Sequence, residues 1–110
     1  MTFETYTNRL VKRLEHLGYV SRKNIKTISF YLPYYTNNND GSSDLFNIYY
    51  EANCVKYMED FNDNIWSLVH SYDYESLKHL YFLSKDFVIR AKKLQIQNKL
   101  KELEKDFQND

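Results

Sequence analysis

The C-terminal third of the chain restricts the fold more than any other part. From Asp73 to the last residue there is no glycine or proline, so the backbone carries no helix breaker over this stretch. Mostly apolar residues recur there in steps of three and four, which places them on one face of a helix. They are Leu77, Leu80, Tyr81, Ser84, Phe87, Val88, Ala91 and Leu94. We therefore predict a long C-terminal helix that packs on the rest of the protein.

The last turns of this helix carry a second apolar set on a rotated face. It consists of Ile96, Leu100, Leu103 and Phe107. A helix of some 30 residues is roughly 45 Å long, whereas a domain of this size has a radius of gyration of only about 13 Å. The end of the helix must therefore project, fold back, or meet a partner. Pairing with a second copy would give a homodimer through the C-terminal helix.

The first 18 residues predict another helix. Its apolar residues share one face, and they are Phe3, Tyr6, Leu10, Leu14 and Leu17. Thr2 or Thr5 is suited to the N-cap, and Gly18 stands where a left-handed C-cap residue belongs. The basic residues of this segment fall on the other face.

The segment between the two helices alternates with the period of β-strands. After a polar connector at 19–26, one apolar set comprises Ile28, Phe30, Leu32 and Tyr34, and a second comprises Phe46, Ile48, Tyr50, Ala52 and Cys54. The turn-forming residues at 37–43 separate them. We predict an antiparallel hairpin whose apolar pairs are Leu32 with Ile48, Phe30 with Tyr50 and Ile28 with Ala52.

One further element completes the predicted fold. Asn62 or Asp63 could cap a short helix that carries Ile65, Trp66, Leu68 and Val69. The prediction is a single α+β domain over residues 1–110, with a helix, an antiparallel β-hairpin, a short helix and the long C-terminal helix. The alternative is an all-α fold, because the short apolar runs at 25–32 and 45–55 also fit helical spacing.

Residues that carry catalytic chemistry are scarce. The single cysteine, Cys54, cannot form an internal disulfide, and we expect it to be buried on the apolar face of its strand. The three histidines have no metal-binding spacing, and the two glycines form no phosphate-binding loop. We predict that the protein is not an enzyme and uses no cofactor or metal. The lack of a long apolar run predicts no membrane association and a cytoplasmic location.

Charge is balanced in total but segregated along the chain. The sequence has 15 basic and 15 acidic residues. Residues 1–28 carry six basic and two acidic side chains, and residues 40–75 carry one basic and eight acidic ones. Residues 76–101 carry seven basic side chains and one acidic one. Such blocks indicate a function in binding charged partners.

The first functional hypothesis rests on the acidic block and its aromatic residues. We expect them to bind a basic cleft on a larger protein, with aromatic anchors and carboxylates that speed encounter. The predicted partner-binding residues are Tyr49, Glu51, Tyr57, Glu59, Asp60, Asp63 and Trp66. The protein would then be an accessory or regulatory protein, and an inhibitor of an enzyme such as one that processes nucleic acid. Its composition is similar to that of small phage and mobile-element accessory proteins.

The alternative hypothesis is a small dimeric regulator that binds nucleic acid through the basic long helix, together with the basic face of the first helix. The candidate residues are Arg90, Lys92, Lys93, Lys99 and Lys101. We rank this alternative second because the calculated isoelectric point of about 6.8 is far from the basic value typical of nucleic-acid-binding domains.

Overall fold

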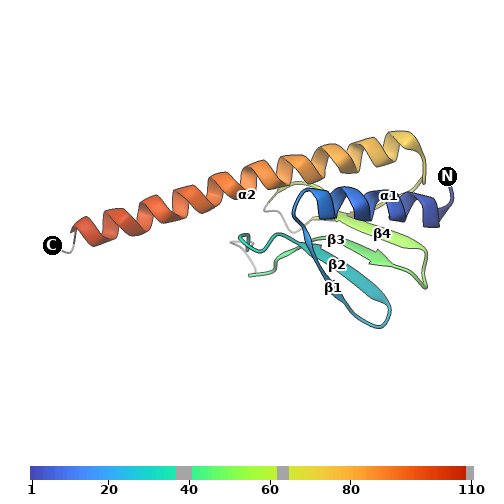
Figure 1. Cartoon of the computed structure of the whole chain (residues 1–110), viewed down its shortest axis with the longest axis horizontal. Helices are drawn as coiled ribbons and strands as arrows, with labels where there is room; N and C mark the ends of the chain where they lie inside the picture. Colours follow the sequence, from blue (N-terminus) through green and yellow to red (C-terminus); the bar gives the residue numbers. More distant parts are fainter. Residues whose placement is uncertain (37–40, 62–64, 109–110) are drawn as a thin grey trace.

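The protein has an α+β fold, which confirms the predicted class and shows that the all-α alternative was wrong (Figure 1). The computed structural model describes residues 1–36, 41–61 and 65–108. In chain order the elements are α1 (Phe3–His16), β1 (Val20–Lys23), β2 (Thr27–Tyr31), β3 (Asp44–Tyr49), β4 (Cys54–Met58), β5 (Trp66–Leu68) and α2 (Tyr74–Gln108).

The five strands form one antiparallel sheet in which each strand pairs with the next along the chain. Both helices lie on the same side of this sheet, and α1 runs beside the first half of α2 (Figure 1). The molecule therefore has two layers, with the core between the helices and one face of the sheet.

The sheet is larger than the predicted hairpin. The stretch expected to be a polar connector contains β1, whose residues are all exposed at the sheet edge. The short helix predicted near Asn62 and Asp63 was also wrong for its described part, because Trp66–Leu68 is the edge strand β5. Helix and strand periodicities are hard to separate over three residues, and pairing with β4 decides in favour of the strand.

The register of the central strands also differs from the prediction. Ile28 pairs with Ile48, and Phe30 pairs with Phe46 rather than with Tyr50. The difference arises because β3 ends at Tyr49 and the chain turns through Asn53, which has a left-handed φ of 49°. The residues expected to continue the second strand therefore form a turn and the start of β4. Cys54, expected to be buried, is partly exposed at that start.

The pairing of β2 with β3 shifts register between Phe30 and Tyr31, which pair with Phe46 and Asp44. This leaves Leu45 as an extra residue on β3, as in a β-bulge. Leu45 and its neighbour Phe46 are both fully buried, although consecutive strand residues normally face opposite sides.

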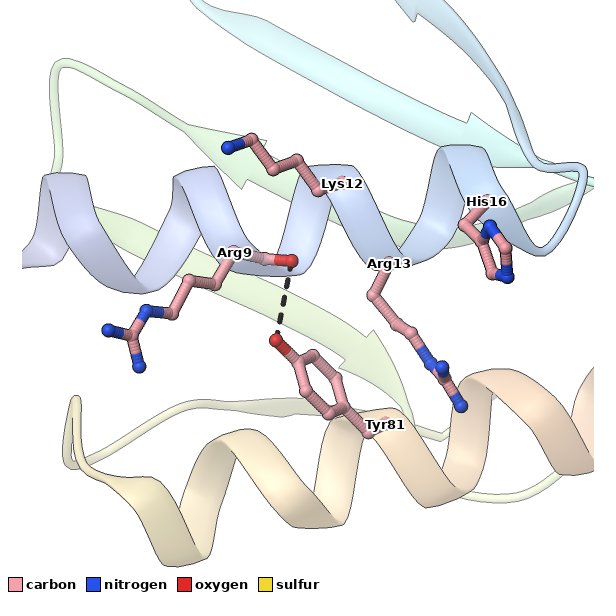
Figure 2. Close-up of a pocket in the computed structure, with 5 residues that line it drawn as sticks. All are labelled: Arg9, Lys12, Arg13, His16 and Tyr81. Atoms are coloured by element: carbon pink, nitrogen blue, oxygen red, sulfur yellow. Dashed lines mark hydrogen bonds between the residues drawn. The ribbon is translucent and has the colours of Figure 1, made fainter.

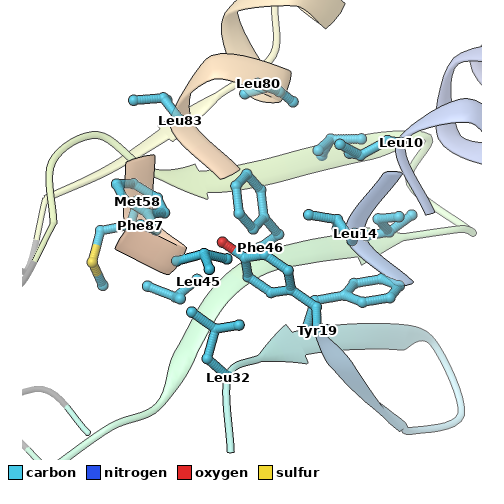
Figure 3. Packing of buried hydrophobic residues seen from close by; sticks show 14 of the residues in the cluster. Leu10, Leu14, Tyr19, Leu32, Leu45, Phe46, Met58, Leu80, Leu83 and Phe87 are labelled. Carbon is cyan, nitrogen blue, oxygen red and sulfur yellow. The ribbon is translucent and has the colours of Figure 1, made fainter. Parts of the chain in front are cut away.

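The core joins α1, the sheet and the first half of α2 (Figure 3). Phe46 lies at its centre, with the ring of Tyr19 5.6 Å away and the ring of Phe87 on α2 5.9 Å away, measured between ring centroids. Leu10 and Leu14 of α1 are fully buried in the same cluster. The apolar stripes predicted for the two helices are thus the faces that pack on the sheet.

Two buried tyrosines fix α2 to the rest of the protein. The Tyr19 hydroxyl donates a hydrogen bond of 2.8 Å to the carbonyl oxygen of Ser84. The Tyr6 hydroxyl and the Ser76 hydroxyl share a hydrogen bond of 2.8 Å. Burial raises the pKa of both phenols, that of Tyr6 to about 12, because the charged phenolate is poorly solvated there.

The end of α1 is determined by Gly18, as predicted. Its φ of 94° is left-handed, and its backbone N–H donates to the carbonyl of Glu15. The next N–H, that of Tyr19, donates to the carbonyl of Leu14, which completes a Schellman motif. At the other end, the Thr2 hydroxyl oxygen accepts from the N–H of Thr5, so Thr2 is the N-cap.

The second half of α2 extends beyond the sheet and α1 (Figure 1). The molecule measures 60 Å along its longest axis and 27 and 23 Å along the others. The apolar set predicted on the rotated face stays exposed, and its members are Ile96, Leu100, Leu103 and Phe107. The projecting half of the helix thus carries apolar side chains that this chain does not cover.

Gly18→Ala should lower the free energy of unfolding by about 1–2 kcal/mol, because alanine is strained in the left-handed conformation. An added Cβ would meet no atom within 4 Å, so the loss comes from the backbone alone. Urea denaturation measures it. Gly18→Asn should lower the free energy of unfolding less, since asparagine tolerates this conformation. Equal stability of Gly18→Ala and the unmodified protein would contradict the left-handed conformation of Gly18.

Stability should fall as the pH rises from about 10 to 12. The pKa of Tyr6 is raised to about 12 in the fold, whereas its ordinary value is 10.0, so the unfolded chain releases this proton first. Tyr6→Phe should lose about 1 kcal/mol at pH 7 through the missing Ser76 hydrogen bond, yet show a smaller further loss at pH 11. Urea titrations at both values test this. If the free energy of unfolding fell equally between pH 7 and pH 11 in the unmodified protein and in Tyr6→Phe, the raised pKa of Tyr6 would not be the cause.

Candidate functional site

An open groove lies between α1 and α2 on the side of the helices away from the sheet (Figure 2). Its volume is about 350 Å³, and it is lined by Arg9, Lys12, Arg13, His16 and Tyr81. Figure 2 shows Arg13 and His16 extending toward α2, while Lys12 points away from it. Four of the five lining residues are therefore basic, and all four come from α1.

The spacing of residues on α1 explains this concentration of basic side chains. Positions 9, 12, 13 and 16 follow each other in steps of three, one and three, which keeps them on one side of a helix. Glu4 and Glu15, the acidic residues of α1, lie about 100° or more around the helix from Arg9 and Arg13. The α1 side chains that line the groove are therefore all basic, and the acidic residue nearest to them around the helix is Glu15, about 60° from Lys12.

Two tyrosines of α2 hold the arginines in place. The Arg13 guanidinium lies over the ring of Tyr81, 5.5 Å from its centroid, and the Arg9 guanidinium lies 5.4 Å from that of Tyr74. Arg9 also donates a hydrogen bond of 2.9 Å to the Tyr74 hydroxyl, which lowers the pKa of that phenol. The Tyr81 hydroxyl donates to the backbone carbonyl of Arg9 at 3.4 Å.

Arg13 has unused hydrogen-bonding capacity. Its Nε is buried and has no hydrogen-bond partner among the described residues. The guanidinium carries a permanent charge, so an anionic oxygen in the groove would be attracted to it. The ion pairs among the described residues join Lys26 to Glu51 and Arg90 to Asp60 and Asp86, so they involve none of the groove cations.

A row of lysines on α2 extends the groove along the helix. Lys78, Lys85, Lys92 and Lys99 are each seven residues apart and all exposed. A seven-residue step returns to nearly the same side of a helix, with a drift of about 20°. Tyr81 is three residues after Lys78 and four before Lys85, so the row lies on the groove side. We call these four residues the lysine row.

Two of the five residues predicted for nucleic-acid binding, Lys92 and Lys99, belong to this row. Lys93 lies about 100° further around α2, and Lys101 lies on the other side. Arg90 is also separate, because its guanidinium makes ion pairs of 2.9 Å with Asp60 and 3.5 Å with Asp86. The hydrogen bond from Arg90 lowers the pKa of the Asp60 carboxyl.

The residues predicted to bind a larger protein are not gathered on one surface. Tyr57 pairs with Phe46 and faces the helices, where its ring lies 5.9 Å from that of His79. Tyr49, three residues after Phe46, is on the opposite face of the sheet. Trp66 is partly buried against the core at the β5 edge.

The acidic members of that set are similarly scattered. Glu51 lies 3.6 Å from Lys26, and Asp60 is held by Arg90. Glu59 is exposed, and Asp63 lies outside the described residues. Binding to a basic cleft of a larger protein therefore stays a prediction that this arrangement does not test.

The spacing of residues along the chain predicts the basic face of the first helix but not the groove. The groove depends on α1 and α2 lying side by side, and their pairing is set by residues some 65 to 70 positions apart, such as Tyr6 with Ser76. The seven-residue spacing of the lysines was visible in the sequence and could have marked the row. Helical spacing places Tyr81 in the stripe predicted to face the core, whereas in the structure it also lines the groove.

No family model, curated protein or solved structure matches the chain. Among the described residues, no cluster of three or more histidine, cysteine, aspartate or glutamate side chains could hold a metal ion. Neither helix in the described part of the chain combines the length and the apolar character that crossing a bilayer requires.

Proposed function

We propose that the protein binds nucleic acid through the groove between α1 and α2 and the adjoining lysine row, by contacts with the phosphate backbone. The observation that carries this proposal is the continuous basic surface on one side of the helical layer. Its permanent cations lie in the groove and along α2, and none of them has a carboxylate partner within the described residues.

The dimensions of the surface suit a linear polyanion. The lysine row spans 21 residues of helix, which is roughly 32 Å at 1.5 Å per residue. Double-stranded DNA carries one negative charge per about 1.7 Å of its axis. Because both strands wind around that axis, a duplex lying along α2 would bring phosphates to part of the lysine row and to the groove cations, about four contacts in all.

The aromatic residues of the site favour a duplex over a single strand. Binding of single strands relies on exposed rings on which bases stack. Here the rings of Tyr74 and Tyr81 are occupied by the guanidinium groups of Arg9 and Arg13. The site thus offers charge and hydrogen-bond donors rather than stacking surfaces, which is suited to recognition independent of sequence.

The balanced total charge of the protein does not oppose this function. Of the twelve acidic residues in the described part of the chain, five lie in the sheet and its loops and three lie at the far end of α2. Arg90 engages both Asp60 and Asp86 on another side of α2. At 0.15 M salt, charges more than about 8 Å apart are largely screened from each other. A phosphate in the groove would therefore respond mainly to the nearby cations.

Fluorescence anisotropy with a labelled 30-base-pair duplex tests the proposal. We expect a dissociation constant of about 10⁻⁴–10⁻⁶ M, with log K falling against log salt with a slope near −4 for about four phosphate contacts. Replacing Lys12 and Lys78 together by alanine should weaken binding and reduce the slope by about 2. Both lysines are exposed, so the melting temperature should not change.

The replacement of Lys101 and Lys105 together by alanine provides the matched control, because it removes two exposed lysines from the other side of the same helix. It should leave the slope unchanged. Absence of binding at 50 mM salt, or equal losses in the control and in the variant that lacks Lys12 and Lys78, would contradict the proposal. Equal affinity for polyglutamate of the same charge would contradict phosphate recognition and indicate an acidic protein as the partner.

A further inference from the structure

An apolar stripe runs along α2 on the side that faces away from the sheet. Its six members are Phe82, Ile89, Ile96, Leu100, Leu103 and Phe107. Each exposes between 45% and 78% of its surface. The segment of α2 that carries these residues begins over the domain and continues into the projecting half of the helix (Figure 1), and all six side chains stay exposed.

The stripe has the repeat of a coiled-coil seam. Phe82, Ile89, Ile96 and Leu103 are each seven residues apart, and in heptad notation they occupy position d. Leu100 and Phe107 then occupy position a, as do Asp86 and Lys93 earlier in the helix. The inner face of α2 already packs on the domain core. A second heptad seam on its outer face therefore indicates that another helix binds there.

A hollow on the stripe has the composition of a coiled-coil hole. It has a volume of about 230 Å³ and is lined by Phe82, Lys85, Asp86 and Ile89. These are the residues i, i+3, i+4 and i+7 of the helix, the four positions that together receive one side chain of a facing helix. The surface is thus shaped to receive an apolar side chain.

We propose that this stripe binds the same stripe of a second copy, with the two α2 helices antiparallel and overlapping from residue 82 to residue 107. This register is the one that covers all six apolar residues of both chains. The facing layers are Phe82 with Phe107, Asp86 with Leu103, Ile89 with Leu100, and Lys93 with Ile96. Leu103 of the second copy then enters the hollow beside Asp86.

Charge favours the antiparallel orientation. In a parallel pair, Asp86 would face Asp86 and Lys93 would face Lys93 across the seam, and like charges in contact are destabilising. In the antiparallel pair each faces an apolar residue instead, while Asp86 keeps its ion pair with Arg90 and the long Lys93 side chain places its ammonium at the edge of the seam. The acidic tip of α2, with Glu102, Glu104 and Asp106, then lies beside the basic segment of the other copy, with Lys85 next to Asp106.

The area and the shape of the chain agree with this pairing. If each side chain buries on the order of 100 Å², six from each copy give roughly 1,200 Å², the lower end of stable interfaces. The stripe faces away from the sheet, so the two domains lie on the outer sides of the helix pair. Antiparallel order also places them at opposite ends, where they do not collide.

The proposed dimer also extends the proposed function. This inference about the two lysine rows rests on duplex binding as the function of the protein. Lys85, Lys92 and Lys99 occupy position g, and in an antiparallel pair the g positions of both chains border the same side of the seam. The two lysine rows therefore form one basic ridge between the two grooves. Lys92 of one copy lies near Lys99 of the other, and a duplex along the ridge would relieve that repulsion.

Light scattering of the full chain without nucleic acid tests the dimer by itself. We expect twice the monomer mass of 13.4 kDa at micromolar concentrations. Leu100→Asp should weaken association on the order of a hundredfold or more, because it places an unpaired charge in the seam. Asn98→Asp adds the same charge on the opposite side of the helix and should leave the mass unchanged. A monomer at 100 μM, or equal effects of both variants, would overturn the proposal.

Disulfide trapping tests the orientation, in a Cys54→Ser background. Chains carrying Ile89→Cys and chains carrying Leu100→Cys should cross-link only when mixed, since these positions face each other in the antiparallel pair. Self-linked dimers of either single variant would indicate a parallel pair and overturn the orientation. Because neither experiment contains nucleic acid, their outcome is independent of duplex binding, and a dimer that binds no duplex would refute only the proposed function.

Discussion

The packing of α2 on one face of the sheet is the interaction on which the rest of the structure depends. Phe87 of α2 meets Phe46 at the centre of the core, and the Tyr19 hydroxyl binds the Ser84 carbonyl nearby. This contact places the first half of α2 beside α1, which creates the groove. It also fixes which side of α2 faces outward, and therefore where the lysine row and the apolar stripe lie.

The three sides of α2 have different chemistry because the helix is longer than the domain it covers. One side is apolar and buried up to Ala91, the second carries lysines seven residues apart, and the third carries an exposed apolar heptad. If α2 only packed on the core, it could end near Ala91, the last of its buried residues. The remaining turns bury little within this chain, and the proposed dimer and the proposed basic ridge both give them a physical role.

Part of the fold was predictable because local physical chemistry determines it. The apolar stripe of α1 and the C-cap at Gly18 follow from helical spacing and from the conformations these residues adopt, and the N-cap was narrowed to Thr2 or Thr5, of which the structure shows Thr2. The strand register was not predictable in this way. Ending β3 at Tyr49, turning through Asn53 and burying both Leu45 and Phe46 depend on which neighbouring strands and helices are available. The edge strand β5 depends likewise on its pairing with β4.

The sequence by itself determined the two amphipathic helices and the segregation of charge, because each follows from the spacing of residues along the chain. It favoured paired strands between the helices, but the short apolar runs there also fitted helical spacing, and strand pairing in the tertiary structure decided between the two. Only the tertiary structure decided which charges lie together. It brought Arg13 of α1 to Tyr81 of α2 and paired Asp60 with Arg90, although 68 and 30 positions separate these residues. The reason is that burial of apolar area sets how the elements pack, and charged side chains then occupy whatever surface that packing leaves.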